Sequence, residues 1–471
     1  MENMHEHNNS RRGFLTGLAG AAVAGLARPR KAHSQGRRTL TIWHTEPAET
    51  AKRAVQKVAD KFAQMHPGVT VVQEGIAWGD LGPKLMTSIV AGNPPDIAQI
   101  QPYMWRSLQK KGLIAPIDDV IKHVGVDNIQ EVVRDIPKYD GHWYGISHHL
   151  GASTLMIRKD LAQEAGFKVP SEITTPMFPT WKDQIEYLEK VTSADKRRWG
   201  MSVPGTGYFL QEHLGRWVAS NGGSFYDEKW NPAFHREPFM GTLEFLKTLA
   251  DKKVLPPDWL GQSYAGASVE FVTGVTTMFD HTKGRSAIDI AKHAPDKNTE
   301  EYFWPIWRPV GPNGKKSFTD LDCEFWVVFA KSQQQDLARE WIKLFFEKDL
   351  YLNYIAQFPV HMIPTTKSLL KDPEYRALPD LNRWKNWVQY QIEYISRKEA
   401  APVGVYGAHE SPIPFQMEIF DSGIIMDELM AIIQNRRKVK EAAERISDRA
   451  NDIIKRLRYP VPDPIRGDKK V

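Results

Sequence analysis

The 471-residue sequence contains a single cysteine, Cys323, so it can form neither an internal disulfide nor a multi-cysteine metal site. This cysteine stands just before the apolar run Phe325–Phe329, which predicts a buried, inert thiol rather than a catalytic nucleophile. The chain also lacks a strong charge imbalance, since 62 basic and 57 acidic residues give a net charge of +5. Because the two signs are interspersed, no nucleic-acid-binding surface is expected.

Motifs of common enzyme classes are missing as well. The sequence has no GxxxxGK[ST] phosphate loop and no HExxH zinc motif. Gly261–Ala265 lacks the final glycine of a nucleophile elbow, and Gly205–Gly207 lacks the rest of a dinucleotide loop. His148 and His149 are adjacent, and neighbouring side chains on a strand point to opposite faces, which makes them a poor chelate. We therefore expect no catalytic residues, no metal and no cofactor.

The N-terminus resembles an export signal rather than a membrane anchor. Arg11 and Arg12 form a twin-arginine pair, and the apolar run Leu15–Ala27 that follows is shorter than the ~20 residues needed to span a bilayer. Ala32–Ser34 has the small-x-small pattern of a cleavage site. These features predict a Tat signal peptide over residues 1–34, cleaved near Ser34, and a periplasmic mature protein.

The chain that follows alternates between strand and helix patterns. A chain of this length predicts two domains of roughly 150 to 250 residues. β-branched and alternating stretches predict strands at 39–44, 69–72 and 97–100. Apolar residues at helical spacing predict helices at 49–65 and 81–90 between them. This order indicates a parallel βαβαβ unit, whose ligands are expected at the carboxyl ends of the strands.

Several short motifs occur in one consistent order along nearly all of the mature chain. They are HPGVTV from His66, LMTSIVAGNPPDIAQI from Leu85, QKKGLIAPIDD from Gln109, Trp143–Ser147, Thr154–Leu161, Pro179–Trp181, Ala219–Gly223, Glu270–Met278 and Phe325–Phe329. In this order and spacing the chain resembles the extracellular solute-binding proteins of family 1, the maltose-binding-protein-like receptors of ABC importers.

The resemblance implies a two-lobed α/β fold in which each lobe is discontinuous in sequence. Chain crossings are expected near His149–Ser153, Arg308–Lys316 and Lys371–Asp380. The expected divisions are a first lobe at 37–150 plus 317–372, a second lobe at 151–312 plus 373–460, and a tail at 461–471. The last helix pattern, from Val439 to Leu457, is the clearest in the chain.

The implied function is that of a monomeric periplasmic receptor without catalysis. It would capture a sugar or polyol between its lobes and deliver it to the ABC permease for import. One alternative is an anionic solute such as a glycerol phosphate, a sugar phosphate or a sulfonated sugar, because Arg and Lys bind such groups. A secreted carbohydrate-active enzyme on the same scaffold, with paired carboxylates, is a further alternative.

Candidate ligand contacts come from strand ends, crossings and loops on both lobes. Aromatic faces cover the C–H surface of a sugar, and carboxylate, amide and imidazole groups pair with its hydroxyls. In the first lobe the candidates are Trp43, His44, Glu46, Trp78, Asp80, Gln101, Tyr103 and Glu324. At the first crossing they are His149 and Gly151, and in the second lobe Tyr208, Gln211, His281, Lys283, Arg285, Tyr406 and His409. We expect His281, Lys283 and Arg285 to lie in a basic loop.

Overall fold

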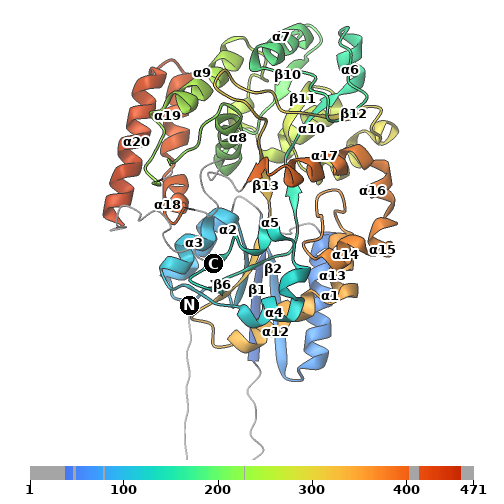
Figure 1. Ribbon diagram of the computed structural model, residues 1–471, viewed down its shortest axis with the longest axis vertical. Coiled ribbons are helices and arrows are strands. Elements are labelled where there is room, and N and C mark those ends of the chain that lie inside the picture. The colour runs from blue at the N-terminus through green and yellow to red at the C-terminus, as the bar shows by residue number, and fades with distance from the viewer. Residues whose placement is uncertain (1–37, 46–48, 78–79, 228, 402–412, 458–471) are drawn as a thin grey trace, which may run out of the picture.

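The structure is a computed structural model that describes residues 38–45, 49–77, 80–227, 229–401 and 413–457. Two α/β lobes lie one above the other along the longest axis of the molecule (Figure 1). Within the described residues, no helix combines the length and the apolar character required to cross a membrane. The two-lobed α/β fold expected from the sequence is confirmed.

The first lobe contains a mixed sheet with strand order β2-β1-β3-β14-β4, and β7 also pairs with β14. Its strands are β1 (Arg38–His44), β2 (Val69–Gly75), β3 (Ile97–Ile100), β4 (Ile114–Ala115), β7 (Ile146–Ser147) and β14 (Phe325–Phe329). β1 pairs in parallel with both β2 and β3, which confirms the predicted βαβαβ unit. β14 enters antiparallel to β3 from a distant part of the chain.

The helices of this lobe cover its sheet with apolar stripes. They are α1 (Glu49–Met65), α2 (Leu81–Val90), α3 (Pro102–Lys110), α4 (Asp118–Val124), α5 (Glu131–Arg134), α12 (Gln335–Phe345), α13 (Lys348–Ile355) and α14 (Lys367–Lys371), with the hairpin β5 (Lys138–Tyr139) and β6 (His142–Trp143). α1 buries Val55, Val58 and Phe62 at helical spacing. Behind the sheet, Trp326 of β14 packs edge-on against Trp341 of α12, with ring centroids 5.3 Å apart.

The second lobe is built on a four-stranded sheet with order β10-β11-β9-β12. Its strands are β9 (Thr154–Arg158), β10 (Trp199–Ser202), β11 (Thr276–Thr282) and β12 (Phe303–Ile306). Its helices are α6 (Lys159–Glu164), α7 (Trp181–Val191), α8 (Gly207–Ser220), α9 (Glu237–Asp251), α10 (Tyr264–Thr273), α11 (Ser286–His293), α17 (Lys385–Ser396), α19 (Ile424–Ile433) and α20 (Val439–Arg456). Three short helices lie elsewhere, α15 (Pro373–Arg376), α16 (Pro379–Arg383) and α18 (Gln416–Asp421).

The predicted start of one helix in this lobe is wrong. The sequence predicts a helical segment from Ile173 to Val191; α7 ends at Val191 as predicted but begins only at Trp181. Pro176 and Pro179 precede it and disfavour helix in the residues before them. Thr180 then caps the helix through a reciprocal capping box with Asp183.

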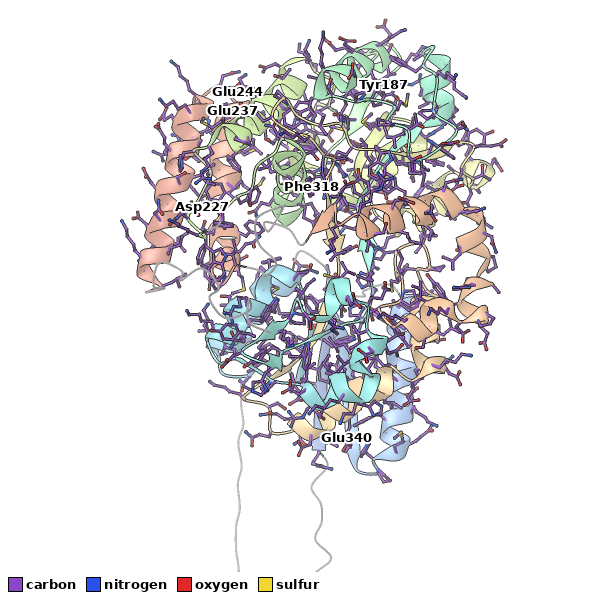
Figure 2. All side chains as sticks on the ribbon, viewed as in Figure 1. Tyr187, Asp227, Glu237, Glu244, Phe318 and Glu340 are labelled. Atoms are coloured by element: carbon purple, nitrogen blue, oxygen red, sulfur yellow. The ribbon has the colours of Figure 1, made fainter. Side chains whose placement is uncertain are left out.

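A small three-stranded sheet joins the lobes. It consists of β8 (Gly151–Ala152), β13 (Thr319–Asp322) and β15 (Ala400–Ala401), in the order β15-β13-β8. β13 lies between the two lobes in Figure 1, and Phe318, the residue before it, lies near the centre of the molecule in Figure 2. β8 falls within the first predicted crossing, His149–Ser153. The residue limits given for each lobe remain a prediction.

Candidate functional site

Three acidic residues follow one another along β13 and the residues after it. Asp320, Asp322 and Glu324 are all buried and stand at every second position. In extended backbone this spacing brings side chains to one side of the chain. A row of buried carboxylates is costly unless each one has a partner. We refer to the region around these three residues, between the two lobes, as the junction. The cations and donors that surround it define its chemistry.

The second lobe supplies cations to this acidic row. Arg216 of α8 lies 2.6 Å from Asp320, measured from Nη1 to Oδ1. Lys283, just after β11, places its Nζ 3.2 Å from Asp322 Oδ1 and 3.8 Å from Asp320 Oδ2. The same Nζ lies 3.7 Å from Glu212 Oε1. Lys283 therefore lies among acidic side chains from α8 and from the strand between the lobes.

Burial and neighbouring charges keep some groups of this cluster charged and others neutral. Burial tends to lower the pKa of Lys283, but the carboxylates of Asp322, Glu212 and Asp320 outweigh it and raise that pKa. Burial raises the pKa of Glu212 to about 8, although Lys283 opposes the shift. Glu212 is thus mostly protonated at neutral pH, while burial and the nearby Arg216 keep His281 neutral by lowering its pKa.

A second ion pair ties the sheet of the second lobe to the chain that leaves it. Arg308 donates from Nε to Asp280 Oδ1 at 2.8 Å and from Nη2 to the same oxygen at 2.5 Å. Trp217 of α8 donates its indole N–H to the other oxygen of Asp280 at 2.5 Å. Burial opposes ionisation of Asp280, yet Arg308 holds its pKa well below the usual range. Each carboxylate oxygen of Asp280 therefore has a hydrogen-bond donor, as expected of a structural ion pair.

The first lobe presents amides to the same junction. Gln101, at the start of α3, donates to Glu324 Oε1 at 2.7 Å, and Gln99 of β3 donates to Glu324 Oε2. Gln99 also accepts from the backbone N–H of Thr45 at 3.0 Å. Polar contacts therefore link the carboxyl ends of β1 and β3 to the start of β14. In open α/β sheets, ligands bind at the carboxyl ends of the strands.

Among the described residues, several buried polar atoms at this junction make no hydrogen bond. On the first-lobe side Thr45 Oγ1 has no partner among the described residues. On the second-lobe side the same holds for Gln211 Oε1, Glu212 Oε2 and His281 Nε2. Glu212 Oε2 and His281 Nε2 lie 2.9 Å apart, but their geometry is not that of a hydrogen bond. Unpaired buried atoms are unfavourable unless a bound molecule or water satisfies them.

Residues 57–383 match the profile of the family described as bacterial extracellular solute-binding protein. The chain belongs to this family. A mannitol-binding protein from Pseudomonas aeruginosa is 27% identical to this solute-binding protein over 50% of the chain and 52% of the relative, so the match spans about half of that relative. A maltotriose-binding protein from Pyrococcus abyssi is 23% identical over 79% of the chain and 76% of the relative.

Solved structures share the fold of this solute-binding protein over nearly its whole length. A solute-binding protein from Agrobacterium vitis with bound D-mannitol has a TM-score of 0.72 and 23% identity, covering 90% of this chain and 100% of its own. A protein from Agrobacterium radiobacter in complex with ribitol has a TM-score of 0.71 and 20% identity, covering 89% and 99%. At this level of identity the likeness shows the fold alone.

The junction of the solute-binding protein brings together part of the predicted contact set. Gln101, His149, Gln211, His281, Lys283 and Glu324 are buried there, and Gly151 stands where an added Cβ would lie 2.9 Å from the His361 carbonyl oxygen. Tyr103 of α3 packs against Phe420 of α18 with ring centroids 5.6 Å apart. Burial raises the pKa of Tyr103, and the charges of Asp421 and Glu212 add to the shift, so Tyr103 also faces the second lobe.

Other predicted contacts lie elsewhere. Trp43 packs beneath Lys84 of α2, with Nζ 4.7 Å from the ring, and His44 interacts with Gln73 of β2. Asp80 is exposed before α2 and makes no side-chain capping bond. The prediction of a basic loop is partly wrong, because His281 lies within β11. Arg285 stacks on Phe358, with its guanidinium carbon 4.4 Å from the ring centroid. Glu46, Trp78, Tyr406, His409 and the side chain of Tyr208 lie outside the described residues.

Several members of the junction were missed by the sequence analysis. They are Gln99, Glu212, Arg216, Asp320, Asp322 and His361. A signal existed for the acidic row, since acids at every second position of a strand indicate one acidic face. Glu212 and Arg216 also stand four residues apart, the spacing of neighbours on a helix. Cys323 is buried as predicted, and burial raises the pKa of its thiol, which disfavours the reactive thiolate.

Proposed function

We propose that this protein is the periplasmic receptor of an ABC importer, which binds a sugar or polyol between its lobes and delivers it unchanged to the permease. The observation that carries the proposal is the set of buried polar atoms from both lobes that make no hydrogen bond among the described residues, at Thr45, Gln211, Glu212 and His281. Hydroxyl groups both donate and accept, so a polyhydroxylated solute can satisfy such a mixture. The bound mannitol and ribitol of the structural relatives fit the same class.

Neutral solutes suit the charge distribution better than anionic ones. Lys283 is shared among Asp322, Glu212 and Asp320, Arg216 pairs with Asp320, and Arg308 pairs with Asp280. A phosphate or sulfonate entering the junction would meet these carboxylates and would have to displace one of them. We therefore favour a carbohydrate or polyol over the anionic alternative.

Ligand contacts are proposed for the candidates that meet at the junction. They are Gln101, Tyr103, His149, Gly151, Gln211, His281, Lys283 and Glu324. We also propose Tat-dependent export, with the signal over residues 1–34, since the twin arginines precede an apolar run. A monomer that meets the inner-membrane permease through its outer surfaces completes the proposal.

A thermal-shift screen tests the solute class. The panel contains D-mannitol, ribitol, maltotriose and glycerol 3-phosphate, and a solute at 100 times its Kd stabilises the folded state by about 2.7 kcal/mol. We expect a shift with a neutral sugar or polyol that is recovered unchanged. Gln211→Leu should remove the shift, whereas Gln184→Leu, which alters a buried glutamine of α7 that contacts two methionine sulfurs, should keep it. A response to glycerol 3-phosphate alone, or turnover of the sugar, would refute the proposal.

A further inference from the structure

Two histidines and an aspartate converge beside the β8–β13 pairing. His361 Nδ1 lies 3.5 Å from Asp322 Oδ2, and His149 Nε2 lies 3.9 Å from Asp322 Oδ1. The two imidazole rings have their centroids 5.1 Å apart. All three side chains are buried, and one potential ligand atom from each lies within 4.8 Å of the others.

The separations in this group are too long for hydrogen bonds but resemble the spacing of ligands around a metal ion. His149 Nε2 and Asp322 Oδ2 make no hydrogen bond among the described residues. Tetrahedral zinc with Zn–N and Zn–O bonds of about 2.0–2.2 Å separates its ligand atoms by roughly 3.3–3.6 Å. The observed distances of 3.5 and 3.9 Å are close to this range. Because the candidate atoms of the three residues all lie within 4.8 Å of one another, the side chains would have to move closer together to surround an ion.

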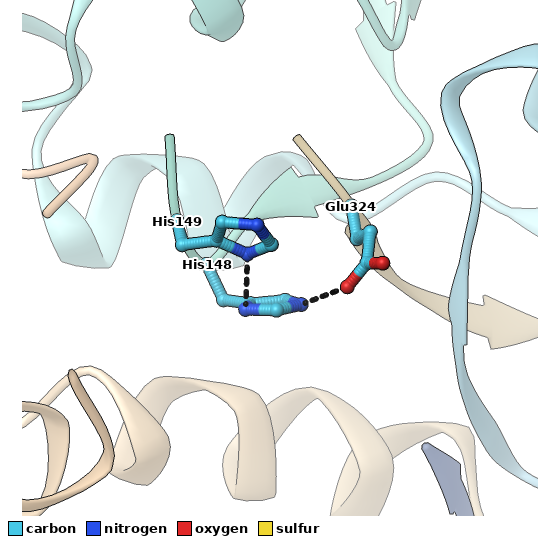
Figure 3. Close-up of side chains that lie close together, drawn as sticks. All are labelled: His148, His149 and Glu324. Atoms are coloured by element: carbon cyan, nitrogen blue, oxygen red, sulfur yellow. Dashed lines mark hydrogen bonds and ion pairs between the residues drawn. The ribbon is translucent and has the colours of Figure 1, made fainter. Parts of the chain in front are cut away.

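The expectation that His148 and His149 diverge is wrong, because both lie in the segment between β7 and β8 rather than on a strand. Their Nδ1 atoms are 3.2 Å apart, and His148 Nε2 lies 3.6 Å from Glu324 Oε2 (Figure 3). Glu324 already accepts from Gln99 and Gln101, which leaves it poorly placed to bind an ion, whereas His148 can orient the ring of His149 through the contact between their Nδ1 atoms. Groups that orient the ligands in this way commonly surround metal sites.

We propose that His149, Asp322 and His361 form a binding site for a divalent transition-metal ion of the zinc class at the junction of the lobes. Two imidazoles and a carboxylate are ligands that zinc prefers, and three protein ligands leave the fourth position for water. The proposal is independent of which solute the protein binds.

Lys283 opposes the binding of a second cation at this site. Its Nζ lies 3.2 Å from Asp322 Oδ1, so an ion on Asp322 would meet its positive charge. Lys283 follows β11 of the second lobe, whereas Asp322 ends β13. Removal of this charge by Lys283→Met should therefore tighten metal binding, which a merely structural cluster would not do.

Calorimetric titration with ZnCl₂ tests the site in the full-length protein, prepared without a polyhistidine tag and stripped with EDTA. We expect one zinc ion per chain, and at least a roughly tenfold weaker Kd for His361→Gln. His66→Gln is the matched control, since His66, which directly follows α1, lies 3.2 Å from Glu340 of α12 in a partly exposed pair. This control should bind zinc as the parent protein does.

Cobalt substitution supplies a second measurement if His361→Gln does not fold. Co²⁺ in a tetrahedral nitrogen and oxygen site gives intense visible absorption, which Asp322→Asn should abolish and His66→Gln should preserve. Absence of stoichiometric zinc binding would overturn the proposal. Equal zinc affinity in the parent protein and the folded His361→Gln variant would also overturn it, because binding would then be adventitious.

Discussion

Arg216 of α8 and Asp320 of β13 form a fully buried ion pair, with Nη1 2.6 Å from Oδ1. Arg216 also donates from Nη2 to the backbone oxygen of Asp280 at 3.1 Å and lies 2.9 Å from His213 Nδ1. One guanidinium thus connects a helix and a strand of the second lobe to the small sheet between the lobes. The pair fixes the place where the acidic row meets the cations.

Removal of one partner of this pair should strongly destabilise the protein. Asp320→Asn leaves the Arg216 charge buried without its counterion, a situation that costs about 3–5 kcal/mol. The free energy of unfolding, measured by urea denaturation, should fall by that amount. Asp251→Asn is the control, because Asp251 pairs with Lys247 on the surface, where such pairs contribute about 0–1 kcal/mol. Equal losses in the two variants would contradict the prediction.

Stability should reach a maximum near pH 6.5. Burial lowers the pKa of His148, His213, His281 and His361 from 6.5, to about 4 for His213. Below pH 6.5 the unfolded chain therefore binds more protons than the folded one, and stability rises with pH. The pKa of Glu212 is raised from 4.5 to about 8, so the folded chain binds the extra proton between these values and stability falls as pH rises.

The two trends separate because the four imidazoles outweigh one carboxyl group below pH 6.5, whereas of these five groups only Glu212 titrates above it. Between pH 6.5 and 8 the free energy of unfolding should fall by about 2 kcal/mol, at about 1.4 kcal/mol per pH unit for one proton. Glu212→Gln should flatten this alkaline limb and keep the acidic one. Chemical denaturation across the pH range measures both, and an unchanged alkaline limb in the variant would assign the effect to another group.

The local elements of the first lobe could be predicted because their apolar spacing matches one secondary structure. Ile97–Ile100 and Glu49–Met65 have the predicted bounds, since a continuous apolar run and a helical stripe each leave little ambiguity. The helix predicted from Ile173 begins at Trp181 instead, because prolines and the capping of Thr180 decide its start.

The junction could be predicted only in part, because its pairing depends on distant segments. Gln101 and Glu324 were candidates, but their contact joins residues that β14 brings beside β3 from far along the chain. The sequence predicts that Lys283 lies in a basic loop that would attract an anion, whereas folding surrounds it with Asp322, Asp320 and Glu212. Composition shows that charges are present, but the fold decides which of them remain available to a ligand.

Gly284 should not tolerate a side chain. A Cβ at this position would lie 2.1 Å from the backbone nitrogen of His361, and backbone cannot rotate away as a side chain can. Gly284→Ala should therefore lower the free energy of unfolding by roughly 1–3 kcal/mol or more through overpacking. At Gly261 an added Cβ meets nothing within 4 Å, so Gly261→Ala is the matched control. Equal denaturation midpoints for the two variants would show that the chain near His361 can move aside.

Glu418 of α18 connects the helices of the second lobe to α3 of the first. It accepts from Ser107 Oγ at 2.5 Å and lies 2.5 Å from Lys111 Nζ. On the other side of α18, Gln211 of α8 donates to the backbone oxygen of Phe420 at 3.5 Å. These contacts join the two lobes next to the junction, so they should stabilise the conformation that encloses the solute.

Glu418→Gln should weaken solute binding roughly tenfold, equivalent to about 1.4 kcal/mol, mainly through faster dissociation. The amide keeps the size of the side chain but removes the charge that pairs with Lys111. Glu393→Gln is the control, because Glu393 of α17 pairs with Arg397, the residue that directly follows the same helix. Stopped-flow dissociation of the solute identified by thermal shift compares the variants. If Glu418→Gln and the parent protein release solute at the same rate, the α3–α18 contact does not contribute to retention of the solute.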